Sequence, residues 1–279
     1  GMISRYGVVA MASSTDTVGP ITRTVRDSEI IADILAGQDQ RDGTVYPRYF
    51  SQIAESPSGQ RIGLIEDFIG EGVDDDVASR TNQLAQRLRE SGHRVDLVKL
   101  PMARYALAIY YIVIPAELSS NMARYDGIRY GERSPEAHRL DDVYGMSRDD
   151  GLMPENKRRI MIGSYVLSSG YYDAYYLKAQ QARTLLIRQL DKLFESYDFL
   201  LSPVSPTPAF KLGENTHDPL KMYLADAMTV PASLAGLPAI SVPNGRSGTG
   251  LPIGVQLIAP AKADASLLAM AKQLEADDA

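Results

Sequence analysis

The segment spanning residues 61–100 places the strongest constraint on the fold. Residues 61–67 (RIGLIED) form an apolar run of strand length, and residues 95–100 alternate in the manner of a second strand. Between them, residues 74–91 show a helical pattern that opens on three aspartates and is followed by Gly92. A strand, a helix and a strand in this order typically form a parallel pair joined by a right-handed crossover. The segment therefore predicts a β-α-β unit.

The rest of the chain continues this alternation. Residues 6–12 (YGVVAMA) predict a buried strand, and a helix is expected from Thr24, where T-x-x-D supplies a cap, to Gly37. Residues 38–59 are polar and predict an exposed loop. Further strands are expected at residues 199–202, 239–242 and 253–259, and further helices at residues 140–148, 219–234 and 263–274. The pattern predicts one α/β domain over residues 1–279, with a mixed, largely parallel sheet flanked by helices.

Two longer apolar segments predict the remaining helices. One begins at Met102, and Pro115 is expected to kink or interrupt it, because proline costs about 3 kcal/mol inside a helix. The other begins at Pro154 and is expected to continue past Gly170 into a long amphipathic helix. Its predicted core stripe consists of Leu186, Leu190, Leu193 and Phe194.

Composition argues against several classes of protein. The net charge of −6 argues against a general nucleic-acid binder, which would carry a basic stripe. The sequence has no cysteine, which excludes disulfides, thiol nucleophiles and cysteine metal sites within it. No window approaches the roughly 18 uninterrupted apolar residues of a membrane span.

Residue chemistry alone assembles no catalytic centre and no metal site. The three histidines, His93, His138 and His217, lie far apart in polar or turn segments and are expected at the surface. The acids at residues 74–76 could suggest a metal, but acids at the positive end of a helix are a simpler interpretation. Residues 168–170 (SSG) could offer a nucleophile, but no base is placed near them, and close packing is the simpler role for such small residues.

Residues 157–181 (KRRIMIGSYVLSSGYYDAYYLKAQQ) combine two adjacent arginines, an apolar run, two serines and four tyrosines within six residues. A solvent-facing helix has no need of so many aromatic side chains. The segment is therefore predicted to be a packed helix with a ligand-facing end, or a contact surface for a partner chain.

Four stretches resemble a known family. They are residues 4–27 (SRYGVVAMASSTDTVGPITRTVRD), 121–131 (NMARYDGIRYG), 157–185 (KRRIMIGSYVLSSGYYDAYYLKAQQARTL) and 218–243 (DPLKMYLADAMTVPASLAGLPAISVP). Together they are similar to the A subunits of glutamyl-tRNA(Gln) amidotransferases, within the amidase signature family. Thr17 departs from the pattern, because family members usually carry glutamine there.

The resemblance implies an amidase signature fold that lacks its N-terminal part. In this family glutamine is hydrolysed by two serines and a lysine in a Gly/Ser-rich signature. The expected runs GGSSGG and GSDTGGS do not occur in this sequence. The chain is therefore similar to the C-terminal portion only, and we expect it to contain no catalytic residue and to be inactive by itself.

The resemblance also implies three contacts to glutamine, through Tyr110, Arg159 and Asp226. The planar guanidinium of Arg159 suits the α-carboxylate, and the Asp226 carboxylate suits the α-ammonium. Tyr110 offers a wall and a hydroxyl. Without the resemblance, the simpler interpretations are a surface arginine, an acid on a helix surface and a core tyrosine.

At the level of function, the resemblance implies the ammonia-releasing A subunit of the enzyme that converts Glu-tRNA(Gln) to Gln-tRNA(Gln). The implied partners are glutamine and the B and C subunits, with tRNA contacted only indirectly and no membrane. ATP and Mg would be used by the B subunit, no cofactor is expected in this chain, and the implied location is cytoplasmic. Two alternatives stay open: a truncated, non-catalytic scaffold or binding module, and a fragment of a general amidase. If the N-terminal part of the fold is absent, apolar surface that it would cover is exposed, and we therefore expect self-association.

Overall fold

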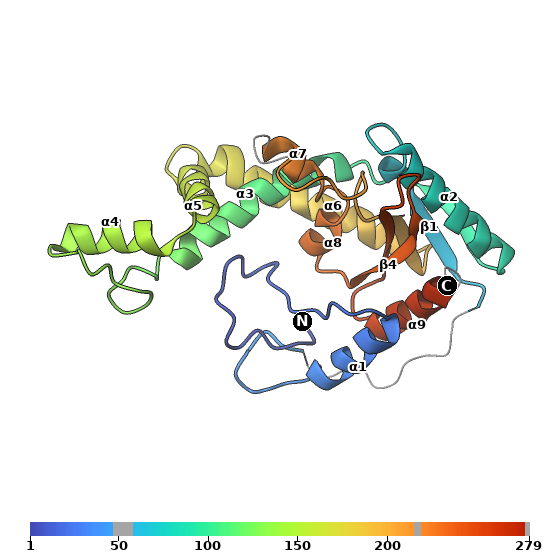
Figure 1. Cartoon of the computed structure of the whole chain (residues 1–279), viewed down its shortest axis with the longest axis horizontal. Coiled ribbons are helices and arrows are strands. Elements are labelled where there is room, and N and C mark those ends of the chain that lie inside the picture. Colours follow the sequence, from blue (N-terminus) through green and yellow to red (C-terminus); the bar gives the residue numbers. More distant parts are fainter. Residues whose placement is uncertain (47–57, 215–218, 277–279) are drawn as a thin grey trace. The chain divides into compact units, whose positions relative to one another are not determined.

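The computed structural model describes residues 1–46, 58–214 and 219–276 (Figure 1). Their contacts divide the chain into two compact units. Unit 1 comprises residues 1–6, 17–107 and 183–279, and unit 2 comprises residues 7–16 and 108–182. Two of the four boundaries between the units fall within helices, namely α3 (Ala103–Met122) and α6 (Lys178–Phe194). The single domain over residues 1–279 stays a prediction.

A five-stranded sheet forms the centre of unit 1, in the order β2-β1-β3-β5-β4. Its first three neighbours, β2 (Arg94–Val98), β1 (Arg61–Ile65) and β3 (Phe199–Pro203), are parallel. The other two strands, β5 (Pro252–Ile258) and β4 (Ala239–Arg246), pair antiparallel to their neighbours. The sheet is therefore mixed, as predicted, and the strands of the predicted β-α-β unit are parallel.

Three helices of unit 1 contribute buried apolar side chains to one core with the sheet. Their bounds are α1 (Val25–Leu35), α2 (Asp75–Glu90) and α9 (Asp264–Ala276). The core joins Leu84 and Leu88 of α2 and Met270 and Leu274 of α9 to Leu257 of β5. Helix α2 begins as predicted, because the Asp74 carboxylate caps it by accepting a hydrogen bond from the Asp76 amide. The acids at residues 74–76 are thus explained by the helix they start.

Helix α1 also begins where the sequence predicts, with the Thr24 hydroxyl accepting a hydrogen bond from the Asp27 amide. It lies beside α9 (Figure 1), where Glu29 is buried and forms ion pairs with Arg26 and Lys272. Its isoleucine and leucine side chains are all exposed. Ile30, Ile34 and Leu35 are exposed, and the exposed fraction of Ile34 is 75%.

The buried strand predicted at residues 6–12 is wrong. The structure has turns and loop there, and Val8 and Val9 are both exposed. The preceding residues are fixed to unit 1 by backbone contacts, with Ile3 bridged to Ala36 and the Gly37 amide bonded to the Met2 carbonyl. An apolar run of strand length therefore forms a loop here, since no neighbouring strand pairs with it within the described residues.

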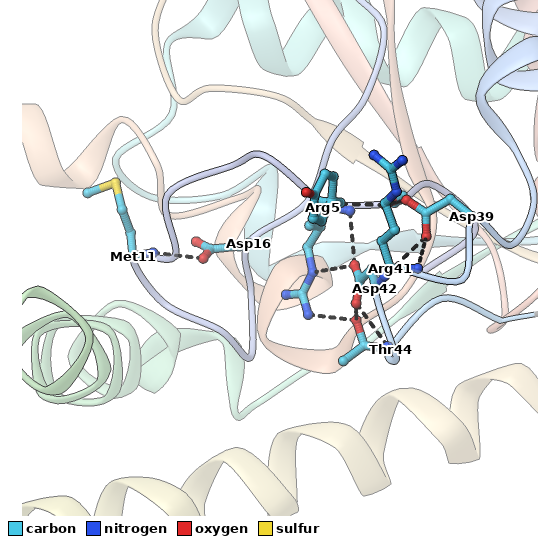
Figure 2. Close-up of polar contacts among 9 residues, drawn as sticks. Arg5, Met11, Asp16, Asp39, Arg41, Asp42 and Thr44 are labelled. Carbon is cyan, nitrogen blue, oxygen red and sulfur yellow. Dashed lines mark hydrogen bonds and ion pairs between the residues drawn. The ribbon is translucent and has the colours of Figure 1, made fainter. Parts of the chain in front are cut away.

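Polar side chains fix the start of the chain to residues 38–46, in the first part of the loop predicted at residues 38–59. Residues 47–57 of that loop lie outside the described residues. The Arg5 amide donates to Asp42 Oδ2 at 2.9 Å, and Arg5 Nη2 donates to Thr44 Oγ1 at 2.8 Å (Figure 2). Asp42 Oδ1 also accepts from the Thr44 hydroxyl and the Thr44 amide. These donors, led by the Thr44 hydroxyl, hold the pKa of the Asp42 carboxyl well below its usual range.

This lowered pKa predicts an acid-dependent contribution to stability. A carboxylate whose folded pKa lies below its unfolded value of about 3.9 stabilises the fold above that value, and the contribution is lost as the pH falls toward the folded pKa. We expect Asp42→Asn to be less stable than the parent near neutral pH, and the difference to shrink below about pH 4. Urea unfolding of both chains across this range measures it. A difference that does not change with pH would contradict the assignment.

His93 is buried, which corrects its prediction as a surface residue. Its Nδ1 accepts a hydrogen bond from the Gln60 amide at 3.1 Å, and its Nε2 lies 3.0 Å from the Gln273 side chain. The ring therefore connects the chain entering β1 with α9. His138 is exposed, as predicted, and His217 lies outside the described residues.

Unit 2 is helical in its described part and holds most of α3, together with α4 (Leu140–Gly151), α5 (Pro154–Leu167) and the π-helix η2 (Tyr172–Leu177). The helix predicted to continue past Gly170 is interrupted at residues 168–171, where α5 ends before η2 and α6 begin. Leu186 and Leu190 of α6 are fully buried, and Leu193 and Phe194 are half-buried.

Three short helices complete the described elements: η1 (Glu66–Phe68), α7 (Pro219–Leu224) and α8 (Val230–Ala235). The single helix predicted at residues 219–234 is therefore two helices joined by a turn. No helix in the described part of the chain is long and apolar enough to cross a membrane.

Candidate functional site

Arg159 lies on α5, whose start follows from its sequence. Pro154 occupies the first helical turn, where its missing amide hydrogen costs nothing, and Glu155 places a negative charge at the positive end of the helix. Glu155 stands one turn before Arg159, and its Oε1 accepts a hydrogen bond from Arg159 Nε at 3.1 Å. The Arg159 side chain is 23% exposed. It is therefore a half-buried cation held by an acid of its own helix.

The charge of Arg159 is stabilised by its surroundings. Burial acts to lower the pKa of the guanidinium, but the hydrogen bond to Glu155 and the nearby Tyr110, Glu155 and Tyr111 together raise that pKa above its ordinary value. Tyr110 and Tyr111 are neighbours on α3, with ring centroids 5.1 Å apart and planes at 81°. The structure thus brings two predicted site residues, Tyr110 and Arg159, into one electrostatic environment within unit 2.

Helices α3 and α5 approach each other very closely beside this pair. A Cβ atom added to Gly163 would lie 2.0 Å from the Pro115 carbonyl oxygen and 2.6 Å from Ser119 Cβ. The hydroxyls of Ser119 and Ser164 are 2.9 Å apart and share a hydrogen bond. Pro115 does not interrupt α3, which continues to Met122. Glycine at residue 163 is therefore required by the contact between the two backbones.

A compact loop at residues 11–16 rests on the same helix α3. The Asp16 carboxylate accepts hydrogen bonds from the Met11 amide, drawn in Figure 2, and from the Ala12 amide. Asn121 Nδ2 donates to the Met11 carbonyl, and Glu117 accepts from the Ser14 amide. Because Tyr110, Glu117 and Asn121 are seven and four residues apart, they share one face of α3. Neither Glu117 nor Asn121 was predicted from the sequence as a site residue.

Asp226, the third predicted residue, lies in unit 1, in the turn between α7 and α8. Its side chain is exposed, and its carbonyl accepts hydrogen bonds from the Thr229 and Val230 amides. The buried Gln256 of β5 anchors this turn by donating to the Met228 carbonyl at 3.0 Å. Asp226 belongs to unit 1 and Tyr110 and Arg159 belong to unit 2, and the approach of Asp226 to that pair stays a prediction.

The serines and tyrosines after Arg159 do not form the packing predicted for them. Ser168 and Ser169 are exposed, and the Ser168 hydroxyl donates to the Tyr165 carbonyl at 2.7 Å. Tyr165, Tyr171 and Tyr175 form an exposed cluster, in which Tyr165 and Tyr171 have ring centroids 4.3 Å apart. Hydrogen bonding to Tyr171 raises the pKa of Tyr165 to about 12. The described residues hold no cluster of acids and histidines suited to a metal ion.

Fold and site together define an α/β protein with a mixed sheet and a fixed arginine suited to a carboxylate ligand. The chain belongs to the amidase family, whose family model, described as Amidase, matches residues 1–268.

The chain is also similar to A subunits of glutamyl-tRNA(Gln) amidotransferases in sequence and in structure. The chain is 47% identical to the glutamyl-tRNA(Gln) amidotransferase A subunit of Koribacter versatilis and 50% identical to that of Geotalea daltonii; each match covers 99% of this chain and 58% of that protein. The crystal structure of the corresponding A subunit from Thermotoga maritima superposes with a TM-score of 0.79 at 39% identity, and the match covers 100% of this chain and 56% of that one. The chain thus spans little more than half the length of these relatives, in agreement with the predicted C-terminal portion.

Proposed function

We propose that this chain is the glutamine-binding portion of an amidotransferase A subunit. The observation that carries the proposal is Arg159, a half-buried cation beside Tyr110, in a chain 47% identical to a protein of that name. In the proposed role Arg159 pairs with the α-carboxylate of glutamine, and the Tyr110 ring and hydroxyl line the site. Asp226 pairs with the α-ammonium.

Isothermal titration calorimetry tests this assignment with glutamine and with two analogues, each of which lacks one charged group of glutamine. 4-Aminobutanamide lacks the α-carboxylate, and 5-amino-5-oxopentanoate lacks the α-ammonium. We expect Asp226→Asn to weaken glutamine about tenfold and to leave 5-amino-5-oxopentanoate unchanged, because only glutamine carries the ammonium. The proposed contacts would be contradicted if both analogues bound as tightly as glutamine and Asp226→Asn left the affinity for glutamine unchanged.

Within a complete enzyme, we propose that the bound glutamine supplies ammonia for the conversion of Glu-tRNA(Gln) to Gln-tRNA(Gln). The B and C subunits are the proposed partners, and the B subunit would use ATP and Mg and handle the tRNA. The support for these partners is the likeness to relatives named as A subunits of glutamyl-tRNA(Gln) amidotransferases.

The 279-residue chain by itself is expected to release no ammonia from glutamine. Its sequence contains neither Gly/Ser-rich signature run, so the nucleophilic serine and its activating lysine have no counterpart in it. A coupled glutamate dehydrogenase assay measures the ammonia, with a complete amidotransferase that contains a full-length A subunit as the positive control. Turnover above the rate without protein would overturn this expectation.

The alternative role as a binding or scaffold module is favoured by one observation, the exposed apolar side chains of α1. If they mediate self-association, Ile34→Glu should shift the chain toward the monomer in sedimentation velocity. Leu212→Glu is the matched control, because Leu212 is also exposed in unit 1 and is distant from α1 in the sequence. A parent chain that sediments as a monomer at all concentrations would exclude self-association.

A further inference from the structure

Three residues of α5 form a single stripe along the helix. Glu155, Arg159 and Gly163 are each four residues apart, so they project from nearly the same side. We propose that Glu155 and Gly163 are positioning residues, which hold the Arg159 guanidinium in place for a carboxylate ligand. The identity of that ligand as glutamine rests on the function proposed above, whereas the positioning of Arg159 does not.

Glu155 controls which edge of the guanidinium stays available. Its Oε1 accepts from Arg159 Nε at 3.1 Å, and its Oε2 accepts from Arg158 Nη1 at 2.7 Å. Within the described residues, the hydrogen bond of Arg159 uses Nε alone, which leaves its two terminal nitrogens for a ligand. These two groups donate in parallel and match the two oxygens of a carboxylate. Glu155 thus fixes the rotation of the guanidinium without occupying its binding edge.

Gly163 controls the distance between Arg159 and the tyrosines. It stands one turn after Arg159 on α5 and meets the Pro115 carbonyl backbone to backbone. On α3, Tyr111 stands one turn before Pro115, just as Arg159 stands one turn before Gly163 on α5. The Gly163–Pro115 contact is therefore one helical turn away from the Arg159–Tyr111 interaction. The Ser119–Ser164 hydrogen bond fixes the same register. Any side chain at residue 163 would therefore move Arg159 away from Tyr110 and Tyr111.

Solution NMR of the free chain tests the positioning directly. The Arg159 Nε–Hε signal reports the hydrogen bond to Glu155 through its protection from solvent exchange. We expect this protection in the parent, its loss in Glu155→Ala and its partial recovery in Glu155→Gln, whose amide oxygen still accepts. Asp149→Asn is the matched control, because it removes the ion pair with Lys157 in the same unit and leaves Arg159 untouched. An unchanged signal in Glu155→Ala would overturn the inference.

Ligand binding supplies the second readout. Glu155→Ala is expected to weaken glutamine about tenfold and to leave 4-aminobutanamide unchanged, because only glutamine presents a carboxylate to Arg159. Ser164→Ala, a milder change than any at Gly163, is expected to weaken glutamine in the same selective way but to a smaller degree. Equal weakening of both ligands would indicate general damage to the fold and overturn the inference. If the NMR signals respond as expected but the parent binds no glutamine, the proposed function fails and the positioning of Arg159 is upheld.

Discussion

Replacing Gly163 with alanine is expected to lower the free energy of unfolding by about 3 kcal/mol. The added Cβ would stand 2.0 Å from the Pro115 carbonyl oxygen, which belongs to the backbone of a helix and cannot turn aside as a flexible side chain would. Helices α3 and α5 would have to separate, and the packing beside Arg159 would be lost. Urea unfolding followed by circular dichroism measures the change.

Gly145→Ala is the matched control for this experiment. Gly145 also lies within a helix of unit 2, but a Cβ added there meets no atom within 4 Å. Alanine at that position is expected to be neutral or stabilising by about 0.5–1 kcal/mol, because it restricts the unfolded chain and favours the helix. Equal effects of the two substitutions would mean that the close approach at Gly163 does not limit stability.

Replacing Arg159 with alanine is expected to weaken glutamine binding about a hundredfold, since a charge-assisted, two-point contact to the α-carboxylate would be lost. Arg159→Lys should recover only part of the affinity, because a lysine ammonium is a point charge without the planar pair of donors. Isothermal titration calorimetry with the folded variants measures both effects.

Arg158→Ala controls for the loss of a positive charge at the adjacent position. Arg158 is bonded to the same Glu155, but its side chain is 52% exposed. We expect its removal to change glutamine affinity by less than about threefold, because a solvated charge contributes little. An effect of Arg158→Ala as large as that of Arg159→Ala would refute the assignment of Arg159 to the carboxylate.

Local sequence signals predicted much of the fold. The start of α2 at Asp74 and the start of α1 at Thr24 depend on capping groups that lie within a few residues of each helix. The parallel pairing of β1 and β2 follows from the order of strand, helix and strand. These features need no knowledge of distant parts of the chain.

The predictions that were wrong concern features of another kind, which depend on contacts between distant segments of the chain. Residues 6–12 have the composition of a strand, but pairing requires a neighbour that the sequence does not reveal. His93 lies in a polar segment, but it is buried in the fold, where the Gln60 amide and the Gln273 side chain of α9 contact its ring.

The candidate site was predicted by resemblance, and residue chemistry alone favoured simpler roles for all three of its members. The structure adds the supporting groups that neither approach supplied. Glu155 could have been suspected, since an acid four residues before an arginine is a helix-stabilising pair visible in the sequence. The role of Gly163 could not have been predicted, because it depends on the backbone of the facing helix α3, which the sequence does not place.

The order of strands in the sheet also has a consequence for how the chain is made. Strand β1 pairs with β3, yet β3 is synthesised only after the whole of residues 108–182 in unit 2. At roughly 5–20 residues per second, the residues of β1 and β2 are synthesised several seconds before those of β3, and β1 lacks this partner strand during that time. Unpaired strand edges recruit other chains. We therefore expect the yield of folded protein to rise when this edge of β1 is shielded from other chains during synthesis.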